Sequence, residues 1–481
     1  MFTLSRIAVC AALVSPAFQA HAEGALKLAP CRQELVYGWV AALPKTQTQC
    51  PKPSTAWKLR TFPLDAGTRM LCSYEWKLAS NPSMTGLPSG LAYQPDCMAI
   101  GVQRKQAPFQ PQPAAPNTFD LDAIEADFLD ALDAPPTSTP LSAAIPREYP
   151  TLAFIDALPV DAASPQIGAI QHGNSLETLA GLLAGCDTQP CRFRYSWYDK
   201  AALFPYPGGK VVGSPLDSAE SILNALEHFQ AEQSEHLVLS IGLGFEPDAR
   251  CAAQPDSLVV QALREAIRRT ACATDAIILA PVGNKRDDDV TSGMLYPAKL
   301  ETEELRCDGV PQGRPLVTAI SGVDLWRKPL ASSRAVAKLT TFGGPWAHGG
   351  DPDEQLNPST ASSVAVAGAG PAVALAWWLR DDLDAQSLLE QLKKAAIAGR
   401  GAAASSRVIR VCSMLAKLCA GGNLGRCAQL PKLCPQRAVS DSDGLPPIAA
   451  EPGAAPPAPS GFARKTCVGR GQRIEPSGPG E

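Results

Sequence analysis

The sequence predicts an α/β fold whose main part, residues 148–402, is a doubly wound, mostly parallel sheet. The first observation is a set of short apolar runs such as TLAFIDA (151–157) and DAIILAPVGN (275–284). Such runs are typical of parallel strands that are buried on both faces. The second observation is that amphipathic helical patterns, for example over 217–233 and 257–272, alternate with these runs. The alternation predicts helices on the sheet faces and functional residues at the strand carboxyl ends.

The elements of this part follow one another with few interruptions. A helix over 217–233 is expected to begin with Asp217 or Ser218 as its N-cap. The uniformly small, apolar stretch 359–379 predicts a helix that is buried all round. In chain order we expect a strand at 151–157, helices at 175–185 and 217–233, a strand at 236–244, a helix at 257–272, strands at 275–284 and 314–324, and helices at 359–379 and 384–397.

The rest of the chain has a different composition. Arg6 precedes an apolar run and an Ala-His-Ala site at 20–22, which is typical of a secretory signal. A Pro- and Gln-rich stretch surrounds a short acidic segment, DLDAIEADFLDALD, that favours a short helix. We therefore expect a signal peptide at 1–22, a small disulfide-stapled unit at 23–105, a Pro-rich linker at 106–147, a Cys-rich helical segment at 403–439 and a partly disordered Pro/Ala/Gly-rich tail at 440–481.

The cysteines indicate an oxidising compartment. Of the 15 cysteines, Cys10 lies in the signal, which leaves 14, an even number for an exported chain. Spacing leaves the pairing open, but local pairs such as Cys186 with Cys191, Cys412 with Cys419 and Cys427 with Cys434 are compatible with it. A zinc site is the alternative, and no CxxC pair supports it. The expected localisation is periplasmic or extracellular.

Charge and hydropathy exclude other partner classes. The formal net charge is −4 and no long basic stretch occurs, so nucleic acid is not expected as a partner. No apolar stretch after the signal requires a membrane span. Nothing in the sequence decides the oligomeric state.

Asp156 and His172 are the first two candidate site residues. Asp156 ends an apolar strand, and His172 lies in QHGN before a helix. A carboxylate can fix the tautomer of an imidazole, and a neutral imidazole can accept a proton from a hydroxyl. An ordinary turn carboxylate and a packed loop histidine are the simpler readings of each residue alone.

Asn284 and Ser363 complete the pattern. Asn284 follows Gly283 at a strand end, where its amide NH2 can donate to a developing oxyanion. Ser363 opens the apolar helix, where free N–H groups favour negative charge. A Gly-Asn turn and simple helix capping are the simpler readings here. The order Asp, His, Asn, Ser is one working order of a serine hydrolase.

Together these segments resemble the subtilisin-like serine peptidases (subtilases). AFIDALP resembles the segment of the family's catalytic Asp, HGNSLETLAG that of its His, APVGN that of its oxyanion Asn, and ASSVA that of its nucleophile. The resemblance implies Asp156, His172 and Ser363 as the triad and Asn284 in the oxyanion hole. It also implies that Gly242, Leu243 and Gly244 line the primary specificity pocket. The substrate is then a protein or peptide, and no cofactor is needed. Structural calcium is common in the family, but no acidic loop in this sequence requires it; RDDDV (286–290) is a candidate, for which a solvated run of charges is the simpler interpretation.

The sequence departs from the family at several points. Ala157 and Leu158 stand where Thr-Gly is usual, the His segment lacks its second His, and Ala361 replaces a Gly. A shifted alignment would give Thr360 the role of Ser363. The sequence therefore predicts an exported serine endopeptidase, with a weakened subtilisin-like pseudoenzyme that acts as a secreted binding or assembly protein as the alternative. An esterase is a second alternative, against which the absence of a G-x-S-x-G elbow argues.

Overall fold

The computed structural model describes seventeen stretches of the chain, and all of them belong to the unit formed by residues 1–437. They are 36–76, 84–97, 99–101, 128–134, 150–156, 176–177, 179–184, 194–198, 203–206, 210–232, 234–246, 257–285, 292–304, 306–307, 314–344, 362–420 and 424–434. His172, Thr360, Cys186, Cys191 and the RDDDV segment fall outside the described residues, as do the signal peptide and the tail.

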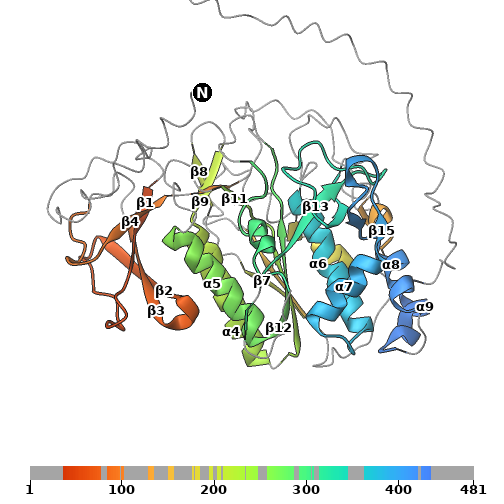
Figure 1. Cartoon of the computed structure of the whole chain (residues 1–481), viewed down its shortest axis with the longest axis horizontal. Coiled ribbons are helices and arrows are strands. Elements are labelled where there is room, and N and C mark those ends of the chain that lie inside the picture. Colours follow the sequence, from red (N-terminus) through yellow and green to blue (C-terminus); the bar gives the residue numbers. More distant parts are fainter. Residues whose placement is uncertain are drawn as a thin grey trace, which may run out of the picture. The chain divides into compact units, whose positions relative to one another are not determined.

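A mostly parallel sheet is the centre of the described structure (Figure 1). Its strand order is β15-β16-β14-β13-β12-β10-β6-β7, and within the described residues only the β15–β16 pair is antiparallel. The α/β fold class with a mostly parallel sheet is therefore confirmed. The strands are β6 (Thr151–Ile155), β7 (Arg194–Tyr198), β10 (His236–Ile241), β12 (Asp275–Pro281), β13 (Thr318–Val323), β14 (Leu339–Phe342), β15 (Ile397–Ala398) and β16 (Arg407–Val408).

Alternate residues of each central strand enter two different cores. In β6, Leu152 and Phe154 pack with α6 (Ser362–Leu379) and α7 (Ala385–Ala395), whereas Ala153 and Ile155 pack with α4 (Pro215–Glu232) and α5 (Leu258–Ala273). This alternation explains why the strands are apolar throughout, since neither face meets water.

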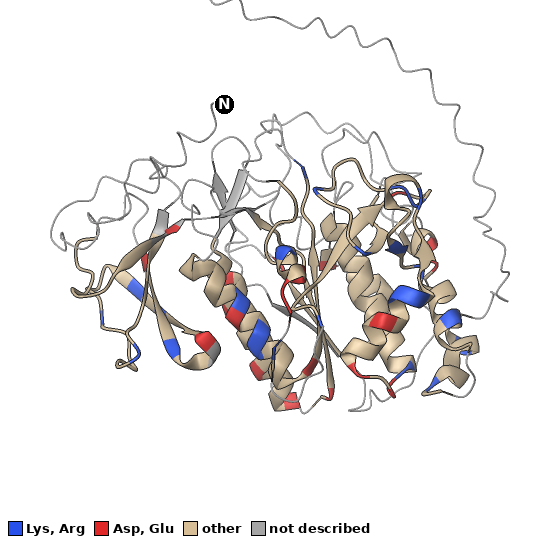
Figure 2. Cartoon of the chain, in the orientation of Figure 1, with Lys and Arg blue, Asp and Glu red and all other residues tan. Residues whose placement is uncertain are grey.

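Helix α6 is the central helix of one core. It contains no charged residue, and it is drawn almost entirely in tan in Figure 2. Every residue of α6 is buried, and a Cβ added at Gly370 would lie 2.3 Å from the Ser240 hydroxyl oxygen of β10. Glycine thus lets the helix approach the sheet closely. Among the described residues α6 is the one helix long and apolar enough to cross a membrane, and its surroundings are protein.

A segment inside the predicted linker also belongs to this core. Residues 128–132 form a short helix, as the acidic segment predicted, and Phe128 and Leu132 are fully buried. Both side chains lie against Gly368 of α6. Asp133 then accepts hydrogen bonds from the backbone N–H and the hydroxyl of Ser413, at the start of α8 (Val411–Leu418).

The N-terminal residues form an antiparallel sheet of order β2-β3-β1-β4, from β1 (Val36–Ala42), β2 (Trp57–Leu64), β3 (Arg69–Trp76) and β4 (Tyr93–Cys97), with η3 (Asp65–Gly67) joining β2 to β3. One face shares a core with α4 and α5 through Val40, Phe62, Leu64 and Leu71. The other face buries the aromatic residues Trp39, Trp57, Tyr74 and Tyr93.

A second antiparallel sheet, of order β11-β5-β9-β8, follows this one in the chain. Its strands are β5 (Ala99–Gly101), β8 (Leu203–Tyr206), β9 (Lys210–Gly213) and β11 (Phe245–Glu246). β5 lies between β11 and β9, and it begins only two residues after β4 ends. A segment from the N-terminal part of the chain is thus inserted between two segments of the α/β part.

The predicted N-cap of the helix at 217–233 needs correction. Helix α4 begins at Pro215, and the hydroxyl of Ser214 accepts a hydrogen bond from the N–H of Leu216 at 3.1 Å. Ser214 is therefore the cap, not Asp217 or Ser218, because proline is favoured at the first helical position. Asp217 is instead buried and paired with Arg60.

The disulfides of the C-terminal segment are nested rather than sequential. Cys412 pairs with Cys434 and Cys419 with Cys427, which overturns the local pairs compatible with the spacing. Cys412 and Cys419 lie at opposite ends of α8, about 10 Å apart along the axis by helical rise, which is too far for one bond. Two further disulfides join Cys50 with Cys72 and Cys272 with Cys307. The four disulfides of the described residues fit an oxidising compartment.

The C-terminal part of the described chain is completed by α9 (Leu430–Leu433), η5 (Gly401–Ala403) and η6 (Cys427–Gln429), whereas η4 (Ala298–Thr302) lies between β12 and β13 in the chain. The nested segment lies at the carboxyl end of α6, where the N–H of Arg426 donates to the carbonyl of Leu379 at 2.7 Å. It therefore stabilises the end of α6 that is remote from Ser363.

Candidate active site

Asp156 lies at the point where the strand order of the sheet reverses. It follows β6, and the chain continues to β7 on one side of β6 and then returns to β10 on the other. In open α/β sheets, ligands bind in the crevice at this switch point. The carboxyl group of Asp156 is fully buried. Its position thus agrees with a role in chemistry better than with an exposed turn.

Gly242 provides the space for this carboxylate. The N–H of Gly242 donates to the carbonyl of Ile155 at 2.8 Å, which extends the pairing of β10 with β6. A Cβ added at Gly242 would lie 2.1 Å from the Asp156 Oδ2 atom. Gly242 was predicted to line the specificity pocket, and the structure shows it against the side chains of Asp156 and Leu176.

Gly244 and Gly283 lie against the same side chain, Leu295. A Cβ at Gly244 would lie 3.0 Å from Leu295, and one at Gly283 would lie 2.5 Å from it. Leu295 is buried, and the next residue, Tyr296, exchanges two backbone hydrogen bonds with Phe245 of β11. The glycines after β10 and β12 therefore face one another across a buried leucine. Leu243, the remaining predicted pocket residue, is buried beside them.

Asn284 is held by the first residue of α6. Its side-chain Oδ1 atom accepts hydrogen bonds from the Ser362 N–H at 3.0 Å and from the Ser362 hydroxyl at 3.2 Å. The same hydroxyl accepts from the N–H of Gly283 at 3.1 Å. Because Oδ1 is engaged on the Ser362 side, the amide NH2 points the other way and is left to donate.

Ser362 and Ser363 occupy the first turn of α6. Both are buried, with 1% and 5% of their surfaces exposed. The first turn of an 18-residue helix carries the positive end of the helix dipole, which stabilises negative charge. The sequence did not single out Ser362, because two adjacent serines look equivalent until the bond to Asn284 is seen.

These contacts form two groups at the carboxyl ends of the parallel strands. Asp156 and Gly242 form one, and Asn284 with Ser362 and Ser363 forms the other. β6 and β12 are separated by β10 alone, so their ends lie about 10 Å apart by ordinary strand spacing. A side chain that links Asp156 to Ser363 must therefore span several ångströms. His172, predicted for this place, lies outside the described residues.

The histidines that the structure describes lie elsewhere. His228 pairs with Glu232 on the surface of α4. His236 begins β10, at the opposite edge of the sheet, where its ring stacks on Trp377 and faces Asp275 at 3.5 Å. Neither can reach the carboxyl ends of the strands.

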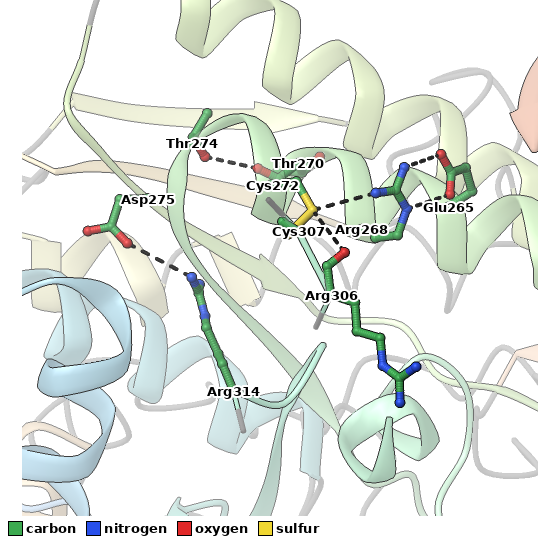
Figure 3. The surroundings of a disulfide bond; sticks show 9 residues. All are labelled: Glu265, Arg268, Thr270, Cys272, Thr274, Asp275, Arg306, Cys307 and Arg314. Atoms are coloured by element: carbon green, nitrogen blue, oxygen red, sulfur yellow. Dashed lines mark hydrogen bonds and ion pairs between the residues drawn. A yellow bond between two sulfur atoms is a disulfide. The ribbon is translucent and has the colours of Figure 1, made fainter. Parts of the chain in front are cut away.

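The opposite edge holds structural ion pairs rather than a second site. Figure 3 shows Asp275 facing Arg314, and the Cys272–Cys307 disulfide beside the Arg268–Glu265 pair. Asp275 also accepts a hydrogen bond from the N–H of Ala385, at the start of α7. Burial lowers the pKa of Arg314 against the opposing effect of Asp275. Among the described residues no group of three or more His, Cys, Asp or Glu side chains could hold a metal ion.

Solved structures similar to this chain include subtilisin-like serine proteases. The epidermin leader peptide processing serine protease EpiP from Staphylococcus aureus matches at 11% identity and a TM-score of 0.42, over 81% of this chain and 99% of that chain. MycP1 from Mycobacterium smegmatis matches at 15% identity and a TM-score of 0.36, over 63% of this chain and 95% of that chain. The subtilase cytotoxin SubAB matches at 14% identity and a TM-score of 0.38, over 61% and 96%.

No protein-family model matches the chain, and no curated protein matches it either. The matches extend over most of each solved chain, but their low identities and TM-scores assign no function to this one.

Proposed function

We propose that the protein is an exported serine endopeptidase of the subtilisin-like type. Ser363 attacks the scissile carbonyl, His172 accepts its proton and returns it to the leaving amine, and Asp156 orients the imidazole. The Asn284 side-chain NH2 and the Ser363 N–H donate to the oxyanion. Gly242, Leu243 and Gly244 form the wall along which the substrate lies.

The observation that carries this proposal is the bonding of Asn284 to Ser362. These hydrogen bonds hold the Asn284 Oδ1 atom against the start of α6, so the amide NH2 of Asn284 faces away from the helix. The residue that makes both bonds, Ser362, is the chain neighbour of Ser363. A donor fixed before the reaction needs no reorganisation when negative charge develops. A simple Gly-Asn turn would not require a third segment, 78 residues further on, to fix the side chain.

Two further observations agree with the proposal. Asp156 is buried at the switch point, and the gap of about 10 Å between the ends of β6 and β12 is of the size that an intervening imidazole fills. The register in which Ser363 is the nucleophile also fits the structure, because Ser362 is used to hold Asn284. Thr360, the competing nucleophile, precedes α6.

A fluorophosphonate probe tests the proposal, because it labels only a hydroxyl group that has been activated as a nucleophile. We expect wild type to be labelled, Ser363→Ala to lose labelling, and Thr360→Ala to keep it. Labelling that survives in Ser363→Ala but disappears in Thr360→Ala would identify Thr360 as the nucleophile. No labelling of oxidised, folded wild type would favour the pseudoenzyme. Hydrolysis of esters without casein turnover would favour the esterase.

The strand β5 suggests how the N-terminal part takes part. β5 lies between β9 and β11, and β11 directly follows Gly242–Gly244. An extended peptide that binds by strand addition uses the same backbone groups. Of the roles open to the N-terminal unit, which are inhibitor, folding aid and independent module, this position favours the inhibitor.

A further inference from the structure

The N-terminal sheet meets helix α4 through a cluster of buried charged side chains. Arg60 comes from β2, Glu75 from β3, Asp96 from β4 and Asp217 from α4. Arg60, Glu75 and Asp217 have side chains that are only 8%, 6% and 5% exposed, and Asp96 is fully buried. We call these four residues the interface cluster.

Arg60 is shared among several carboxylates. Its Nη1 atom donates to Asp217 Oδ1 at 2.5 Å and to Glu220 Oε2 at 3.0 Å, while Nη2 faces Glu75. Glu220 lies at the rim, with its side chain 35% exposed. Lys58, the other cation nearby, is 3.3 Å from Glu75 but 59% exposed. Water therefore screens the two outer groups and not the inner four.

Asp96 lies in the same row of the sheet as Glu75. Gly38 of β1 stands between them, paired with Glu75 on one side and Asp96 on the other. The hydroxyl of Ser214, the cap of α4, donates to Asp96 Oδ2 at 3.1 Å. Asp96 has no side-chain cation in hydrogen-bond contact among the described residues.

The charges of the interface cluster do not balance when all carboxyl groups are ionised. One buried guanidinium faces three buried carboxylates, and Asp217 Oδ2 is buried without a hydrogen-bond partner in the described structure. Burying an unpaired charge is costly, and a group in this position tends to become neutral instead. The docked arrangement therefore favours protons on the carboxyl groups.

The titration of the two aspartates agrees with this charge count. Burial raises the pKa of Asp96 to about 6 and that of Asp217 to about 7, from an ordinary value of 3.8. Arg60 opposes both shifts, and the neighbouring carboxylate of Glu75 adds to them. Among the residues that the structure describes, Lys58 and Glu220 are the other charged groups paired with the cluster.

We propose that the interface cluster is a pH-sensitive latch, which holds the N-terminal sheet on α4 in acid and loosens it as the solution becomes neutral or alkaline. A carboxyl group whose pKa is higher in the docked state takes up a proton on docking. The contribution of Asp96 and Asp217 to docking is fully present below about pH 4 and is lost as the pH rises through their docked-state pKa values of about 6 and about 7. Phe62, Leu64 and Leu71 pack in the core that contains α4 and α5, and these apolar contacts do not titrate. The loosening is therefore partial. Because β5 follows β4 after a single residue, loosening also weakens the hold on β5.

Hydrogen exchange of the full-length protein at pH 5 and pH 8, normalised for intrinsic exchange rates, tests the latch without any assay of activity. We expect the protection of β2, β3 and β4 to fall at least about tenfold between these values, since one proton held only in the docked state changes the equilibrium about tenfold per pH unit. Protection of β10 and β12 should stay constant, which separates undocking from global unfolding.

Variants separate the latch from other titrating groups. The Asp96→Asn, Asp217→Asn double variant mimics the protonated carboxyl groups, and we expect it to remain protected at pH 8. Asp65→Asn, which removes the partner of Arg69 in the η3 turn, should behave as wild type. Wild-type protection that is equal at pH 5 and pH 8 would overturn the proposal, as would a double variant that loosens like wild type. The comparison of wild type at the two pH values does not depend on the variants. If the double variant does not fold, the single variant Asp96→Asn takes its place.

Discussion

At the scale of single residues, the candidate site depends on how Asn284 is oriented. Ser362 supplies both hydrogen bonds to Asn284 Oδ1, one from its backbone and one from its hydroxyl. Ser362→Ala keeps the first and removes the second, and it also leaves the Gly283 N–H without its acceptor. We expect kcat to fall about tenfold with little change in KM, because the oxyanion donor acts mainly in the transition state.

Steady-state kinetics on a peptide substrate measure this change. Asn284→Ala should lower kcat by about 10²–10³-fold. Ser362→Thr, which retains the hydroxyl that Ser362→Ala removes, should keep a kcat near that of wild type. A Ser362→Ala enzyme with wild-type kcat would mean that Asn284 needs no such support.

Gly242 offers a second residue-scale prediction. In Gly242→Ala the new methyl group would lie 2.1 Å from Asp156 Oδ2, so the carboxylate has to move. We expect a loss of about 1–3 kcal/mol in unfolding free energy, typical of overpacking, together with loss of activity. Gly244→Ala is the matched control, because its new Cβ meets the flexible end of Leu295 first, at 3.0 Å. Urea unfolding of the two variants should show the larger loss of stability for Gly242→Ala; equal losses would refute the specific contact of Gly242 with Asp156.

The positions of Asp156 and Asn284 at strand ends were predictable, because each follows the end of an apolar run that is typical of a buried parallel strand. The role of Ser362 was not predictable, since capping by any of several hydroxyls in STASS satisfies the same helix start. The role of Asp217 was mistaken for capping, because its partner Arg60 lies 157 residues earlier in the chain. Contacts at such separations leave no local pattern.

At the scale of elements, the strands and helices of the α/β part follow from their periodicity, but the crosslinks do not. Helix α8 keeps Cys412 and Cys419 at its two ends, and only the fold back of α9 brings Cys434 to Cys412. Spacing counts residues along the chain and ignores this reversal.

The nested pairing has different energetic consequences for its two bonds. Cys412–Cys434 closes a 22-residue separation and Cys419–Cys427 one of 8. By loop-closure entropy, the double variant Cys412→Ala, Cys434→Ala should lose about 3 kcal/mol, and Cys419→Ala, Cys427→Ala roughly 1 kcal/mol less. Urea unfolding under oxidising conditions measures both. Fluorophosphonate labelling should persist in each, because the segment contacts the carboxyl end of α6. Cleavage peptides that join Cys412 to Cys419 would contradict the pairing.

At the scale of the whole molecule, the N-terminal part is joined to the α/β part in four ways, of which the pairing of β5 with β9 and β11 is one. The other three are contacts of its antiparallel sheet with α4 and α5. An apolar face packs in a shared core, the interface cluster pairs charges across the junction, and Gln94 of β4 accepts a hydrogen bond from the N–H of Leu258 at the start of α5. The sequence predicted a separate stapled unit at 23–105, and nothing in its composition indicated that its last strand would enter another sheet. Such an insertion becomes visible only when backbone partners are known.

The insertion of β5 leads to a prediction about activity. Ile100 pairs with Val212 of β9 and with Glu246 of β11, so its strand is bonded on both sides. Ile100→Pro removes the N–H of a central strand, which such a strand does not tolerate. If β5 covers the edge that a peptide substrate needs, the uncleaved variant should hydrolyse a chromogenic peptide several-fold faster than uncleaved wild type. Ile100→Val keeps the donor and should match wild type, and circular dichroism should show an unchanged α/β fold in both. An Ile100→Pro protein that is folded but no faster than wild type would mean that β5 holds the N-terminal sheet in place without covering the site.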